Sequence, residues 1–106
     1  MIDYQRLNRD NLLVALAVRS CIGAISSNMR MISFAQDGDR IDMFFDLRHD
    51  VEEDREEAAD MADELAILTE RFRVVPHICI VGDVHLAVPG PDRFVIHKQR
   101  QPDHPG

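Results

Sequence analysis

The chain has 106 residues, 45% hydrophobic and 29% charged, which is typical of one globular domain and excludes a disordered or fibrous protein. We expect a single α+β domain over residues 1–100 and a flexible C-terminal tail over residues 101–106. The longest uncharged run, Ser20–Met29, is far shorter than the roughly 20 apolar residues of a transmembrane helix. Because the first residues lack the basic-then-apolar order of a signal peptide, we expect a cytoplasmic location.

The formal net charge of −7 is concentrated in one segment. Residues 50–64 contain nine acidic residues and the single base Arg55, which gives −8, whereas the remaining 91 residues carry +1. Such a surface repels the phosphate backbone of nucleic acid and an anionic membrane. It attracts a basic protein over a distance. The charge pattern therefore favours a basic protein partner, with no direct nucleic-acid or membrane binding.

The first predicted element is a helix. Its apolar residues recur at spacings of three and four: Leu12, Leu13, Leu16, Ala17, Cys21 and Ala24. Val14, Val18, Ile22 and Ile25 widen the apolar sector, so only a narrow strip around Asn11 and Arg19 is expected to be exposed.

A β-hairpin is predicted next. Residues 30–36 alternate in polarity, and Asp37-Gly38 is a dipeptide favoured in two-residue turns that need positive φ. The return strand places Ile41, Met43, Phe45 and Leu47 on one face and Asp42, Phe44 and Asp46 on the other. Phe44 is either partly covered by another side chain or an exposed anchor for a partner, since aromatic residues are favoured at interface centres.

A second helix is predicted to start at Asp50, because Asp50 and Glu53 have the spacing of a capping box. Its inward stripe comprises Ala58, Met61 or Ala62, Leu65, Leu68 and Phe72. Most of the acidic residues lie between these positions and should face solvent.

Two strands complete the predicted fold. Val74–Val88 is rich in β-branched residues and is expected to form one long strand bent at Gly82, followed by a turn and a final strand over Arg93–Lys98. The order α-β-β-α-β-β predicts a two-layer α+β sandwich, with two helices on one face of a four-stranded antiparallel sheet. We expect a shared core containing Leu13, Leu16, Phe34, Met43, Phe45, Leu65 and Ile78.

The residues that could perform chemistry form no recognisable catalytic motif. On one strand, His77 and His85 would lie about 26 Å apart, too far to share a metal, although His97 on a paired strand could approach either. The acidic segment lacks the alternating Asp pattern of a calcium loop, and no glycine-rich phosphate loop is present. Cys21 and Cys79 lie in apolar segments and are expected to be buried free thiols. We therefore expect no catalytic residue, no metal and no cofactor.

Several segments together resemble small bacterial immunity proteins of toxin systems, including contact-dependent growth inhibition. The resemblance covers nearly the whole chain. The matching segments are Gly23-Ala24-Ile25, Asn28-Met29-Arg30 with Ser33, Asp37-Gly38-Asp39-Arg40-Ile41, Phe44-Phe45, Glu53-Asp54-Arg55-Glu56 with Ala58 and Asp60, and the last strand Phe94–Arg100. Unlike the usual form, this sequence has His77, His85 and a neutral stretch before the last strand. The resemblance implies a non-enzymatic protein that binds and neutralises a cognate toxin.

Three functional hypotheses remain open at the level of sequence. The first is an immunity protein that binds a basic toxin, such as a nuclease, through its acidic helix and adjoining loops. The second is a small RNA-cleaving or metal-dependent hydrolase that uses His77, His85 or His97. The third is a structural or regulatory module that self-associates through a sheet edge or face. For the first, the predicted partner-binding residues are Asp46, Asp50, Glu52, Glu53, Asp54, Glu56, Glu57 and Asp60.

Overall fold

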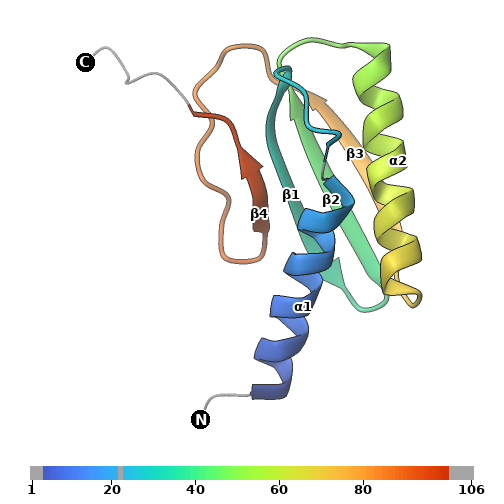
Figure 1. Ribbon diagram of the computed structural model, residues 1–106. Coiled ribbons are helices and arrows are strands. Elements are labelled where there is room, and N and C mark those ends of the chain that lie inside the picture. Colours follow the sequence, from blue (N-terminus) through green and yellow to red (C-terminus); the bar gives the residue numbers. More distant parts are fainter. Residues whose placement is uncertain (1–3, 22, 101–106) are drawn as a thin grey trace.

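The computed structural model describes residues 4–21 and 23–100 and has the predicted element order (Figure 1). The elements are α1 (Tyr4–Cys21), β1 (Met29–Asp37), β2 (Arg40–Leu47), α2 (Glu52–Thr69), β3 (Arg73–Ile80) and β4 (Phe94–Lys98). Both helices lie on the same face of a four-stranded sheet. The predicted tail over residues 101–106 lies outside the described residues. Across the described part of the chain, neither helix is long and apolar enough to span a bilayer.

The sheet is mixed, so the prediction of an antiparallel sheet is wrong. Its strand order is β3-β2-β1-β4, with β1 antiparallel to β2 and to β4, and β2 parallel to β3. The physical reason is the length of α2, whose 18 residues span about 27 Å at 1.5 Å per residue. That length matches the roughly 26 Å of the eight-residue strand β2. The helix therefore returns the chain to the starting end of β2, and β3 runs parallel to it.

The single long strand expected over Val74–Val88 is also wrong. Strand β3 ends at Ile80, and the chain turns at Gly82, which has a φ of 63°. Residues 81–93 then lead to β4 at the opposite edge of the sheet (Figure 1). The last two strands consequently form no hairpin.

The predicted hairpin of β1 and β2 is confirmed. Asp37 pairs with Arg40, so the two turn residues are Gly38 and Asp39. Gly38 has a φ of 59°, whereas Asp39 does not have positive φ. A glycine at the first central position is the requirement of a type II′ turn, which suits the twist of the two strands.

The core lies between the sheet and the two helices. It buries Leu13, Phe34, Met43, Phe45 and Leu65 as predicted, while Leu16 and Ile78 are partly buried against it. The first helix is less covered than predicted, because Leu12 is 60% exposed and Val18 is 44% exposed. Figure 1 shows that the N-terminal half of α1, which ends at Leu12, extends past the end of the sheet and has fewer elements to pack against, whereas Val18 lies in the C-terminal half beside the sheet.

Candidate protein-binding surfaces

One side of α2 is uniformly acidic, and we call it the acidic face. Its members are all exposed: Glu52, Glu53, Glu56, Glu57, Asp60, Asp63 and Glu64. At 100° per residue these seven positions fall within a sector of roughly 140°, over an axial length of about 18 Å. Among the described residues, none of the seven carboxylates forms an ion pair. The acidic face therefore presents uncompensated negative charge to solvent.

The opposite side of α2 explains why the acidic residues point outward. Ala58, Met61, Ala62 and Leu65 are buried in the core, and they fill the sector that faces the sheet. Ile67 lies in the same sector as the acidic residues, at the C-terminal end of the helix, and is 69% exposed. The acidic face thus ends in one exposed apolar side chain.

The start of α2 differs from the predicted capping box. The N-cap is Val51, which makes no side-chain cap hydrogen bond, and the helix begins at Glu52. Asp50 instead accepts a hydrogen bond of 2.5 Å from Nε of Arg55, which lowers the pKa of Asp50. The positive end of the helix dipole is offset by the first-turn carboxylates Glu52, Glu53 and Asp54.

Asp54 has a structural role. It is 6% exposed, and its Oδ2 accepts a hydrogen bond of 2.8 Å from Nδ2 of Asn28. Asn28 also binds the backbone of His49, donating to its carbonyl oxygen and accepting from its N–H, each at 2.8 Å. Asn28 therefore ties two loops to the first turn of α2, and Asp54 is not part of the exposed acidic face.

Asp46 lies on a different surface from the acidic helix. It belongs to the side of β2 that faces away from both helices, and burial raises its pKa, an effect opposed by the charges of Arg93 and Arg30. Of the eight residues predicted from sequence, five share the acidic face: Glu52, Glu53, Glu56, Glu57 and Asp60. Asp50 lies just before it in an ion pair, and Asp46 and Asp54 lie elsewhere.

The sheet surface opposite the helices, which we call the open face, carries an aromatic stack. The rings of Phe44 on β2 and His77 on β3 are stacked with centroids 5.1 Å apart. The guanidinium of Arg93 lies 3.7 Å above the Phe44 ring, a cation–π contact. Phe44 is therefore partly covered by other side chains, the first of the two interpretations that the sequence left open.

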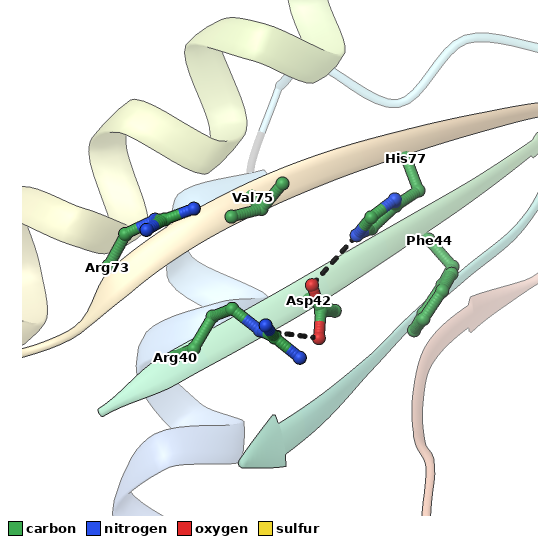
Figure 2. Close-up of a pocket in the computed structure, with 6 residues that line it drawn as sticks. All are labelled: Arg40, Asp42, Phe44, Arg73, Val75 and His77. Atoms are coloured by element: carbon green, nitrogen blue, oxygen red, sulfur yellow. Dashed lines mark hydrogen bonds and ion pairs between the residues drawn. The ribbon is translucent and has the colours of Figure 1, made fainter. Parts of the chain in front are cut away.

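Next to this stack is a shallow hollow of about 300 Å³, shown in Figure 2. Its lining residues are Arg40, Asp42, Phe44, Arg73, Val75 and His77. Both carboxylate oxygens of Asp42 accept a hydrogen bond: Oδ1 lies 2.8 Å from Nε2 of His77, and Oδ2 lies 3.2 Å from Nε of Arg40. The hydrogen bond from His77, with the charges of Arg40 and His77, holds the pKa of Asp42 below its ordinary value.

Sequence reasoning did not identify the hollow, although a signal for it was present. Arg40, Asp42 and Phe44 alternate along β2, and Arg73, Val75 and His77 alternate along β3, so each set lies on one face of its strand. The two sets become neighbours through the parallel pairing of β2 and β3, which the sequence analysis did not predict. The hollow was therefore missed together with the topology.

His77 and His97, one of the pairs considered under the hydrolase hypothesis, do not meet. His77 and His97 lie on the two edge strands, three strand spacings or roughly 14 Å apart. Over residues 4–21 and 23–100, no cluster of three or more potential His, Cys, Asp or Glu ligands could hold a metal ion. Cys21 and Cys79 are both free, as predicted, but Cys79 is exposed rather than buried.

Self-association through the β3 edge is opposed by Pro76. The amides of Arg73 and Val81 donate to Asp39 and Leu47 at the two ends of β2, so the backbone groups of odd-numbered β3 residues point inward. Those of the even-numbered residues, including Pro76, consequently point to the free edge. Proline has no N–H to donate, which is a common protection of edge strands against pairing with another chain.

The comparisons with known proteins identify the family. Residues 9–90 match the MafI2 immunity protein family, a stretch that includes the β1–β2 hairpin, the acidic helix and the hollow. No curated protein sequence matches the chain. The matched family consists of immunity proteins, which act by binding a cognate toxin and not by catalysis. Since the match covers most of the chain, this protein belongs to the MafI2 immunity protein family.

Proposed function

We propose that this immunity protein neutralises a basic toxin by binding it through the acidic face of α2. The observation that supports the proposal is the row of seven exposed carboxylates without an ion-pair partner among the described residues. Stability does not require such a row. Glu52/Glu56, Glu53/Glu57, Glu56/Asp60 and Asp60/Glu64 are like-charge pairs at i,i+4, and each costs a few tenths of a kcal/mol.

A field of one sign accelerates the encounter with a protein of the opposite sign. The gain in association rate is about 10-fold to 1,000-fold at low salt and falls steeply as ionic strength rises. A toxin that cleaves nucleic acid needs a basic substrate-binding surface, because it must bind phosphates. An acidic helix lying on that surface would exclude the substrate. We therefore propose a nuclease as the toxin and the cytoplasm as the place where the two proteins meet.

The remaining predicted residues take different parts in this proposal. Asp50, just before the helix, adds charge at the margin of the acidic face, and exposed Ile67 gives the helix one apolar contact at its other end. Asp54 supports the first turn from inside. Asp46 would contact only a partner that also reaches the open face of the sheet.

The experiment compares two triple variants with equal changes in charge. Glu53→Gln, Glu56→Gln and Glu57→Gln together remove three charges from the acidic face. The matched control combines Asp39→Asn, Glu70→Gln and Asp92→Asn, which are exposed residues outside α2 and outside the hollow. Association with the cognate toxin domain is followed by stopped flow at low and high salt, and protection is measured as growth of cells that express the toxin.

We expect the acidic-face variant to associate about tenfold more slowly at low salt and to protect poorly. The control variant should lose much less association rate and protection, because Asp39 and Asp92 lie outside α2 and Glu70 lies beyond its C-terminal end, far from the turns that carry Glu53, Glu56 and Glu57. An acidic partner would contradict the proposal, as would an acidic-face variant that binds and protects as well as wild type.

A further inference from the structure

Part of the positive charge of this acidic protein lies on the open face of the sheet, away from the acidic face. Arg40 and Arg73 are direct cross-strand neighbours on β2 and β3, and both line the hollow of the open face. Arg73 is exposed and, among the described residues, forms no ion pair. Arg40 shares its charge between Asp42 at 3.2 Å and, more loosely, Asp37 at 3.8 Å. The hollow therefore contains one unpaired guanidinium beside a partly paired one.

The other lining groups leave this positive charge available. Both oxygens of Asp42 are engaged by Arg40 and His77, so this carboxylate has little capacity left to neutralise Arg73. Figure 2 shows Arg40 and Arg73 near one end of the hollow, with the rings of His77 and Phe44 at the other. The hollow thus combines a cationic end with an aromatic wall.

We propose that this hollow is a second toxin-binding site, which accepts a carboxylate side chain of the toxin between Arg40 and Arg73. The two guanidinium groups supply planar, paired donors that match the two oxygens of a carboxylate. Paired guanidinium groups also bind phosphate, but the partner in the proposed function is a protein, so a carboxylate side chain is the anion expected here.

The position of α2 allows one toxin to contact both surfaces. Helix α2 packs against β3, the edge strand that carries Arg73 and His77 (Figure 1). A partner that extends round the β3 edge would meet the acidic face on one side and the hollow on the other. This inference takes its partner from the proposed function, but it concerns a surface of opposite charge.

Because the acidic face is negative and the hollow is positive, binding through the acidic face alone and binding through both surfaces predict opposite effects of one substitution. Arg73→Gln makes the protein more negative, so binding through the acidic face alone would leave its affinity for a basic toxin unchanged or slightly increased. If the hollow accepts a carboxylate, the same substitution should weaken binding about tenfold. Arg71→Gln is the matched control, because Arg71 is exposed, lies two residues away and does not line the hollow.

Cys79 supplies a second measurement that reports directly on the open face. Its exposed thiol lies on the same side of β3 as His77, about 7 Å further along the strand. Cys21 is buried, and burial raises its pKa, so it serves as an unreactive internal reference. We expect the toxin domain to slow alkylation of Cys79 in the native complex, as followed by mass spectrometry.

The combined results separate this inference from the proposed function. Protection of Cys79 together with weaker binding of the Arg73→Gln variant, relative to Arg71→Gln, supports the second site even if the acidic-face variant binds normally. Equal affinities of the Arg73→Gln and Arg71→Gln variants overturn it, whether or not Cys79 is protected. In that case the acidic face is judged from its own variants.

Discussion

Replacing Asn28 with alanine should destabilise the protein by about 3 kcal/mol. The substitution removes the charge-assisted hydrogen bond of 2.8 Å to the buried carboxylate of Asp54, a bond class worth about 1.5–3 kcal/mol. It also removes two bonds to the backbone of His49, which are exposed, so water replaces much of each and about 0.5 kcal/mol apiece is lost. The sum is large against a typical total stability of about 5–15 kcal/mol.

Urea unfolding of wild type and Asn28→Ala, followed by far-UV circular dichroism, measures this loss. Asn28→Asp is the matched variant, because it keeps the shape but places a second carboxylate against Asp54, and it should cost at least as much at neutral pH. A loss below about 1 kcal/mol for Asn28→Ala, with an unchanged m-value, would refute the role assigned to the Asn28–Asp54 contact. Asp54→Asn provides a companion test on toxin binding. Since Asp54 is buried, we expect this substitution to weaken toxin binding less than Glu53→Gln does.

Two further predictions concern the helix faces and the hollow. Leu65→Ala should lower the free energy of unfolding by about 2–5 kcal/mol through lost burial and a cavity, whereas Glu57→Ala should change it by less than about 0.5 kcal/mol. Similar urea midpoints for the two variants would mean that the buried and exposed sides of α2 are misassigned. Because the pKa of Asp42 is lowered, chiefly by its hydrogen bond with His77, its contribution to stability is present above about pH 4 and is lost as pH falls through the lowered pKa. Urea midpoints between about pH 2 and 6 should therefore converge for wild type and Asp42→Asn at the acid end, and a constant difference would exclude this linkage.

Local patterns in the sequence predicted the elements and their inward faces well. The alternation of Ile41, Met43, Phe45 and Leu47 places these residues on the core side of β2, and all four are buried. Helical periodicity likewise identified the buried stripe of α2, including Ala58 and Leu65. Such predictions succeed because a period of 2 or 3.6 residues relates each side chain to its own backbone, without reference to any distant segment.

The pairing of distant strands was predicted less well, for a physical reason that the lengths of the elements make clear. A long helix between two strands returns the chain to its starting end and favours parallel pairing, whereas the sequence analysis assumed hairpins throughout. The two candidate sites differ in the same way, since one depends on local periodicity and the other on the pairing of distant strands. The acidic face depends on helical periodicity alone and could be predicted, but the hollow requires Arg40 and Arg73 to become neighbours across β2 and β3.

The burial of Asp54 shows the limit of charge counting. Nine acidic residues within residues 50–64 look equivalent in the sequence, yet Asp54 is in the sector that faces inward and is held by Asn28. Its partner is 26 positions away along the chain, in the loop before β1. Within the acidic segment, only its helical angle distinguishes it from exposed Glu53: Asp54 lies four residues before buried Ala58, on the inward side of the helix.

The two proposed surfaces differ in how firmly the fold holds their side chains, and this difference suits them to different parts of toxin binding. The acidic residues extend from one side of a helix with no ion-pair partner among the described residues, so their contribution comes from their summed field and depends little on exact geometry. In the hollow, Asp42 holds Arg40 and His77, and Phe44 stacks on His77, while the register of β2 and β3 places Arg73 beside Arg40. In the proposed complex the acidic face therefore sets the rate of encounter, and the hollow discriminates among basic proteins by whether an acidic side chain meets it.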